Sequence, residues 1–160
     1  MKFRNILTIL IILTAINISN AAVQAPIKPT TPVQTTQAPV QNVSSLELVA
    51  NPNKYLNKNI IIDGKFDKFT TLGLDYKKAL KDSTVYIGFL IQRDDVKDHN
   101  IPLSELKLFL KRDYAEKFID LNTGDKISIS GTVFSNALGD AWVDVKTIQV
   151  LEKAPKNNQN

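Results

Sequence analysis

The sequence predicts a small all-β domain with a minor helical part. Five segments between residues 59 and 151 are rich in β-branched residues, and apolar residues in them alternate with polar ones. This period of two is typical of antiparallel strands that have one face toward solvent. Between the third and fourth segments, apolar residues recur at helical spacing. The length of 160 residues suits one domain of this kind.

The alternation also predicts which side chains face the interior. The expected strands cover residues 59–69, 84–93, 105–111, 126–134 and 140–151. In the second and third strands we expect these residues to point inward: Val85, Ile87, Phe89, Ile91, Leu106, Leu108 and Leu110. In the fourth strand, Ile129 is expected to face the interior and Ser130 the solvent.

Two helices are predicted. Ser44 followed by Glu47 forms a capping box that begins a short N-terminal helix, and Pro52 ends it. Residues 113–121 place Tyr114 and Phe118 on one helical face, with Asp113 as the cap. The second helix thus falls between the third and fourth strands.

The order strand, strand, strand, helix, strand, strand is that of the OB-fold, a five-stranded Greek-key barrel. Residues 55–66 (YLNKNIIIDGKF) and 121–133 (LNTGDKISISGTV) resemble the first and fourth strands of bacterial OB-fold domains. Gly64 and Gly131 stand mid-strand, where small barrels bend. The chain resembles exported bacterial OB-fold proteins of the tRNA-anticodon-binding-like group, a name that does not itself imply tRNA binding. The alternative fold is a small open β-sandwich or meander.

The termini differ in composition from the domain, which is expected to span residues 44–153. Residues 1–21 combine Lys2 and Arg4 with an apolar run and a small-residue end, as in a secretory signal peptide. The run is shorter than the roughly 20 residues of a membrane span, although an uncleaved anchor is the alternative. We therefore expect an exported protein, periplasmic or secreted, with no stable membrane insertion after cleavage. Residues 22–43 are rich in Pro, Gln and Thr and predict a disordered linker, and residues 154–160 predict a frayed tail.

Few residues suited to catalysis are present. The chain has no cysteine and one histidine, His99, which excludes thiolate metal sites and cysteine nucleophiles. His99 lies in a polar loop with Asp94, Asp95 and Asp98, whose spacing lacks the pattern of a calcium loop. We therefore expect no enzyme activity, no cofactor and no metal site. A hydrolase is the least favoured alternative.

The predicted function is binding, through the outer face of the second and third strands, where OB-folds take their ligands. The candidate ligand-binding residues on this face are Tyr86, Leu90, Arg93, Lys107, Phe109 and Lys111. The expected role is a non-catalytic binding module of the cell envelope, with a protein, glycan or small ligand as partner. Single-stranded nucleic acid is the alternative. It is disfavoured because the protein is expected to be exported and because removal of Lys2 and Arg4 lowers the net charge from +4 to +2. Alternatively, the N-terminal helix or a partner subunit covers these residues.

Overall fold

The computed structural model of the chain describes residues 39–155. The predicted signal peptide, residues 22–38 of the linker and residues 156–160 of the tail lie outside the described residues. Between them run β1 (Val40–Asn42), α1 (Ser45–Ala50), α2 (Pro52–Tyr55), β2 (Asn59–Thr70), η1 (Lys77–Ala79), β3 (Tyr86–Ile91), β4 (Leu106–Lys111), α3 (Arg112–Ala115), η2 (Glu116–Phe118), β5 (Lys126–Ser135), η3 (Ala137–Gly139) and β6 (Ala141–Glu152).

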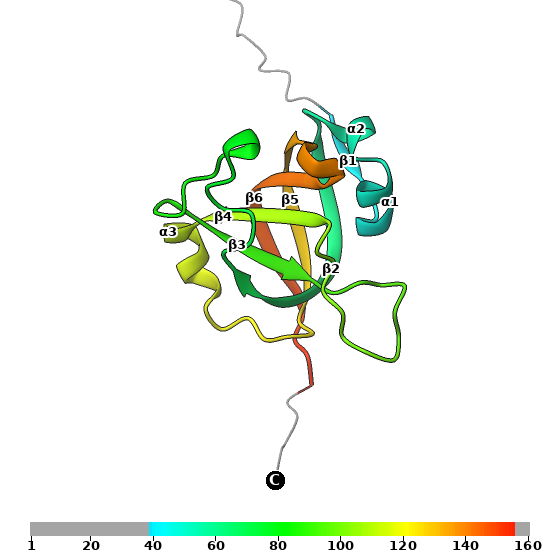
Figure 1. The fold of residues 1–160 in the computed structure, drawn as a ribbon. Helices are drawn as coiled ribbons and strands as arrows, with labels where there is room; N and C mark the ends of the chain where they lie inside the picture. The colour runs from blue at the N-terminus through cyan, green and yellow to red at the C-terminus, as the bar shows by residue number, and fades with distance from the viewer. Residues whose placement is uncertain (1–38, 156–160) are drawn as a thin grey trace, which may run out of the picture. The chain divides into compact units, whose positions relative to one another are not determined.

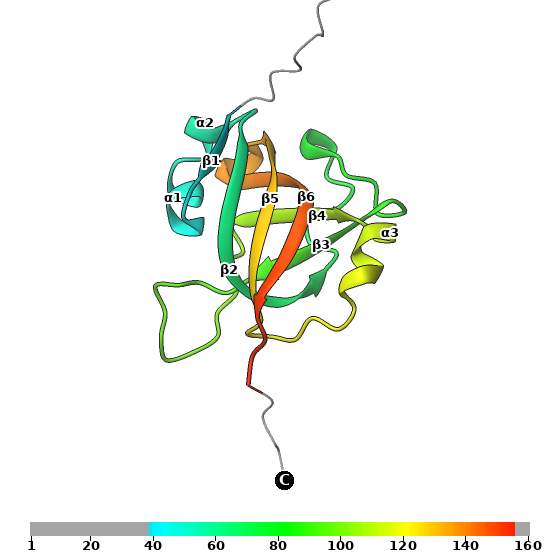
Figure 2. The ribbon, with the colours of Figure 1, turned by 180° about the vertical axis from the view of Figure 1, so that it is seen from behind.

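The five long strands form a closed barrel (Figures 1 and 2). The strands are ordered β2-β3-β4-β6-β5, and β5 pairs back to β2. The β4–β6 pair is parallel, and the other barrel pairs are antiparallel. The short α3 and η2 helices lie between the third and fourth barrel strands, β4 and β5. The predicted all-β, OB-fold-like barrel is therefore confirmed.

β2 closes the barrel because it pairs with two strands in turn. Its first half, from Asn59 to Lys65, pairs with β5, and its second half, from Phe66 to Thr70, pairs with β3. The register shifts between Phe66 and Lys68, which marks a bulge. Such irregularities bend a strand and allow a sheet to curl onto itself.

The interior is filled by the inward residues of all five strands, as the alternation predicts. Ile129 is fully buried, and Ser130 is half-buried on the opposite face of β5. Gly131 permits a close approach of β6, because a Cβ there would lie 2.7 Å from the carbonyl oxygen of Asp144. Val85 is an exception: it is 46% exposed, because a turn from Asp82 precedes β3 and the strand begins one residue later.

The N-terminal boundary also differs from the prediction. Val40–Asn42, which the composition assigns to the linker, form β1 and pair in parallel with residues 59–61 of β2. The N–H of Val43 donates to the carbonyl oxygen of Ile61 (3.0 Å). β3 pairs only with the second half of β2, so the first half has a free edge that β1 takes up.

The short helices follow their local signals. Ser44 caps α1, and its side chain accepts a hydrogen bond from the N–H of Glu47 (3.2 Å), as the capping box predicts. The predicted helix over residues 113–121 is shorter: α3 ends at Ala115 and continues as the 3-10 turn η2. Within residues 39–155, no helix combines the length and apolar character needed to cross a membrane.

Candidate ligand-binding cavity

The outer face predicted as the ligand surface is covered. Phe109 is fully buried and Leu90 is 6% exposed. Phe109 is covered by the β2–β3 connection, residues 71–85, whose Tyr76 ring stacks on Trp142 with centroids 5.5 Å apart. Trp142 in turn stacks on Phe109 at 5.7 Å. The expectation that Leu90 and Phe109 are open to a ligand is therefore wrong.

Phe109 belongs to a second, smaller apolar core outside the barrel. Its buried members are Ala79, Phe109 and Trp142, against which Leu74, Tyr76, Tyr86, Phe134 and Ala137 pack. Lys81 secures the connection: its Nζ lies 3.3 Å from Asp144 Oδ2 and 4.5 Å from the centre of the Tyr86 ring. The β2–β3 connection, rather than the N-terminal helix, thus provides the cover.

Two of the three predicted cations of this face are paired with acidic residues. Lys107 Nζ pairs with Asp140 Oδ2 at 3.1 Å. Arg93 lies in a different part of the molecule, where the hydrogen bond to Asp95 is the largest cause of its raised pKa. Burial opposes this effect, and a hydrogen bond to Glu105 adds to it. Lys111 is exposed. Of the six candidates, the structure brings Tyr86 and Phe109 together in the small apolar core and assembles no site from the set.

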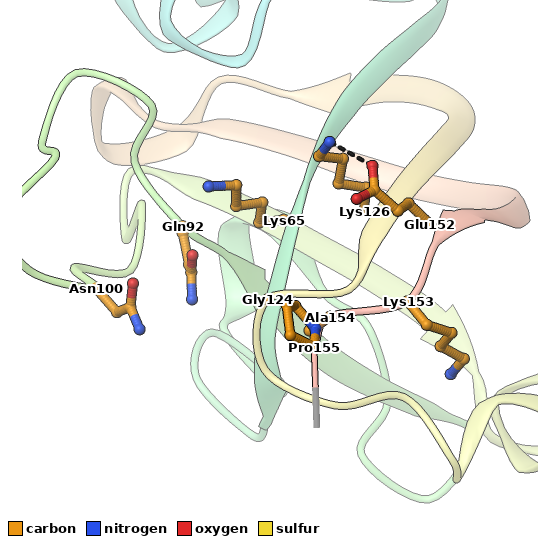
Figure 3. Close-up of a pocket in the computed structure, with 9 residues that line it drawn as sticks. All are labelled: Lys65, Gln92, Asn100, Gly124, Lys126, Glu152, Lys153, Ala154 and Pro155. Carbon is orange, nitrogen blue, oxygen red and sulfur yellow. Dashed lines mark hydrogen bonds and ion pairs between the residues drawn. The ribbon is translucent and has the colours of Figure 1, made fainter. Parts of the chain in front are cut away.

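A polar cavity lies instead where β2 bends, β3 ends and β5 begins. Its volume is about 300 Å³. Figure 3 shows the lining side chains, which come from these strands, from the β3–β4 connection and from the chain after β6. The lining residues are Lys65, Gln92, Asn100, Gly124, Lys126, Glu152, Lys153, Ala154 and Pro155. We call it the barrel-end cavity.

Gln92 is the most constrained polar residue of this cavity. It directly follows β3, and its N–H donates to the carbonyl oxygen of Lys65 (2.8 Å). It also forms an isolated antiparallel bridge with Pro102. Gln92 is 5% exposed, yet its Nε2 has no hydrogen-bond partner within the part of the chain that the structure describes. Buried amide groups are nearly always paired, so this side chain is an exception that requires an explanation.

The three lysines of the cavity differ in their pairing. Lys126 pairs with Glu152 across β5 and β6, as the dashed line in Figure 3 marks. Lys153 Nζ lies 2.8 Å from Asp125 Oδ2. Lys65 forms no ion pair with any described residue. Lys65 is exposed, so its ammonium group is open to a ligand.

Asp125 holds one wall of the cavity in place. Its carboxylate accepts hydrogen bonds from the N–H groups of Asn122 (2.9 Å) and Ala154 (2.8 Å) and from Lys153 Nζ. Burial by itself raises the pKa of Asp125, but these three hydrogen bonds together outweigh burial, and its net pKa is lowered. Ala154, which the sequence assigns to the tail, is therefore tied to the barrel.

A second polar cavity adjoins the first. It has a volume of about 310 Å³ and shares Lys65, Gln92 and Asn100 with the barrel-end cavity. The β3–β4 connection supplies its other walls, including the predicted candidate Arg93, Asp94 and the exposed His99. Among residues 39–155, no three His, Asp or Glu side chains gather in a way that could hold a metal ion.

Sequence reasoning missed this site for a local reason. Gln92 and Lys65 read as ordinary outward positions of two alternating strands. Asn100 lies in a connection with no periodicity. The one available signal was Gln92 itself, a polar residue that directly follows the apolar run of β3.

Comparison with known proteins gives similarities of structure only. No protein-family model matches the chain, and no curated protein matches it in sequence. OBody AM3L15, solved bound to hen egg-white lysozyme, aligns with 74% of this chain and 100% of its own, at 13% identity and a TM-score of 0.47. The Entamoeba histolytica asparaginyl-tRNA synthetase, in complex with asparaginyl-adenylate, aligns at 10% identity and a TM-score of 0.46.

The alignment with that synthetase covers 74% of this chain but only 25% of the synthetase. For a putative aspartyl-tRNA synthetase from Leishmania major Friedlin the shares are 79% and 24%, at 12% identity and a TM-score of 0.42. TM-scores below 0.5 give these similarities no weight for function. The OB-fold-like barrel therefore rests on the strand order of the chain itself, and membership of the tRNA-anticodon-binding-like group stays a prediction.

Proposed function

We propose that the chain is an exported, non-catalytic binding module of the cell envelope that takes a small polar ligand in the barrel-end cavity. The observation that carries this proposal is the buried Gln92 amide, whose Nε2 lacks a partner at the wall of a cavity. An unpaired buried donor costs about 1–3 kcal/mol. Nε2 itself is enclosed, so a ligand removes this cost only when the Gln92 amide turns into the cavity on binding. Binding of this kind stabilises the folded chain.

The chemistry of the lining favours recognition over catalysis. Gln92 and Asn100 present amide groups, which neither gain nor lose a proton near neutral pH. Lys126 and Lys153 are engaged by carboxylates. The cavity volume of about 300 Å³ falls at the lower end of the range for small-molecule sites. The site is therefore suited to holding and orienting one small polar molecule.

The burial of the aromatic face bears on the alternative function. Sequence-tolerant binding of single-stranded nucleic acid uses exposed rings on which bases stack. Phe109 is fully buried and Tyr86 packs against the small apolar core beside it. This arrangement favours a small ligand over an oligonucleotide.

Binding is tested by two-dimensional NMR of the ¹⁵N-labelled protein, which observes side-chain and backbone amides. The panel contains glucose, glucuronate, acetate, inorganic phosphate, calcium chloride and a single-stranded oligonucleotide. We expect at least one small compound to shift the side-chain signal of Gln92 and the backbone signals of Asn100 and Gly124, while Lys111 stays unchanged. If no compound shifts Gln92, or if only the oligonucleotide does, the proposed function is wrong.

Export is tested on the full chain expressed in a bacterial host. The proposal expects the protein outside the cytoplasm, with a mass that corresponds to an N-terminus near Ala22. The expectation is based on the short apolar run of residues 6–16, which is followed by small residues. An intact Met1 in the membrane fraction would contradict export.

A further inference from the structure

We infer that the chain forms a two-fold dimer through an apolar groove beside α3, in which each groove is occupied by a second copy of the chain. The groove has a volume of about 240 Å³ and lies between α3, η2 and the adjacent parts of β2 and β3. It is lined by Phe69, Ile87, Arg112, Ala115, Glu116 and Ile119, and we call it the α3 groove. It shares no lining residue with the barrel-end cavity, so dimerisation is independent of the proposed function.

The floor of the α3 groove is a part of the barrel interior that the chain leaves uncovered. Phe69 and Ile87 pack against the main core, yet both are only half-buried. Val85, which alternation assigns to the same inward face, is 46% exposed. Figures 1 and 2 show α3 beside the beginning of β3, but α3 ends at Ala115 and does not close over these side chains. A hollowed, accessible apolar surface of this kind is typical of a protein–protein contact.

Ile119 supplies the apolar side chain that a second copy presents to the groove. It directly follows η2 and is 75% exposed, more than any other large apolar side chain in residues 39–155. It also lines the α3 groove, so the projecting side chain and the apolar floor belong to one surface. A two-fold axis through this surface places Ile119 of each copy against the floor of the other, and the same contact is made twice.

Two opposite charges beside the groove are complementary to themselves under this symmetry. Arg112 and Glu116 are both exposed, and neither forms an ion pair with a described residue. A cation four positions before an anion is the weaker orientation for a pair within one helix. Arg112 Nε instead donates to the carbonyl oxygen of Ser83 (2.8 Å). Across the two-fold axis, Arg112 of each copy meets Glu116 of the other, so both charges are compensated at once.

The test is sedimentation velocity of the full chain, expressed and processed as in the export test. We expect a reversible equilibrium between monomer and dimer with a dissociation constant below about 1 mM. No larger species should form, because a two-fold contact closes on itself. Monomer at every concentration up to about 1 mM, or assemblies larger than a dimer, would overturn the inference and leave the proposed function standing.

Two matched variants locate the contact. Ile119→Asp should weaken dimerisation about tenfold or more, because it places a charge against an apolar surface. Leu138→Asp makes the same change at a side chain that is 72% exposed and lines no part of the α3 groove, and it should dimerise as the native protein does. Both positions are exposed, so both variants should keep the native melting temperature to within a few degrees. Dimers that persist in Ile119→Asp, or an equal loss in Leu138→Asp, would place the contact elsewhere.

The charged pair gives a second test that leaves Ile119 unchanged. Arg112→Glu alone and Glu116→Arg alone each set like charges against one another across the axis, so each variant should dimerise about tenfold more weakly or less. An equimolar mixture of the two variants should dimerise again, because both pairs of the mixed dimer join opposite charges. A mixture that stays monomeric, or a single variant that dimerises as the native protein does, would overturn the two-fold pairing of Arg112 with Glu116.

Discussion

Phe109 shows what the alternation of residues can and cannot predict about a side chain in this protein. The alternation of β4 correctly places Leu108 and Leu110 in the barrel and Phe109 on the opposite face. Alternation states the direction of a side chain but not what lies beyond it. Here Trp142 and residues 71–85 lie beyond it, and β4 is buried on both faces around Phe109.

The burial of Phe109 gives a direct prediction. Phe109→Ala should lower the free energy of unfolding by about 3–5 kcal/mol, because it leaves a cavity under Trp142 and Tyr76. Denaturant titration measures this change. Lys111→Ala, on the same strand but exposed, should change stability by about 0.5 kcal/mol or less. Similar small effects of both variants would show that the outer face is open.

At the scale of elements, β1 is the feature that composition hides. Its three residues are exposed and lie at the end of a segment rich in Pro, Gln and Thr. They become a strand because the first half of β2 has a free edge, to which a neighbouring segment of any sequence can offer backbone groups. The domain therefore begins before the predicted boundary at Ser44.

A chain that starts at Ser44 should be less stable than one that starts at Pro39. It loses the β1–β2 pairing and the hydrogen bond from Val43 to Ile61. Each backbone hydrogen bond contributes about 0.5–1.5 kcal/mol, so a total loss of about 1–3 kcal/mol is expected. Thermal unfolding should show the melting temperature reduced by several degrees. Equal melting temperatures of the two chains would mean that β1 adds nothing to the fold.

At the scale of the molecule, the barrel is closed by strand pairing and its end is secured by Asp125. This carboxylate joins the turn before β5 to the residues that follow β6. Asp125 is 1% exposed and fully paired. It thus links the closure of the barrel to the wall of the candidate cavity.

The pairing of Asp125 predicts a pH dependence of stability. Its pKa is lowered in the folded protein, so the unfolded chain binds a proton more readily. The ionised Asp125 therefore makes its full contribution to folding stability above the ordinary aspartate pKa of about 4. This contribution is lost as the pH falls through the lowered pKa of the folded protein. Other acids with lowered pKa values, such as Glu47 and Glu105, add to the total.

Comparison of the native protein with Asp125→Asn isolates the contribution of Asp125 to the pH dependence of stability. The stability difference between the native protein and Asp125→Asn should be constant near neutral pH and shrink in acid. Urea titrations at several pH values measure this difference. A difference that stays the same down to the lowest pH would contradict a lowered pKa of Asp125.

The sequence by itself determined the five barrel strands and their order. β-Branched alternation located the barrel strands to within about two residues at their ends, and the Ser44 capping box located α1. These signals are local, since strand period and helix caps depend on residues a few positions apart. With a helix between the third and fourth strands, the order sufficed to predict the barrel.

Only the tertiary structure decided what covers the outer face and where a ligand can bind. Tyr76 packs on Trp142 from a connection without periodicity, and Gln92 meets Lys65 and Ala154 around one cavity although they are distant in the chain. Such contacts depend on how the barrel closes and on which segment lies nearest in space. Neither can be predicted from the residues that are adjacent in sequence. The exposure of a strand face and the pairing of a buried amide are therefore properties of the folded chain as a whole.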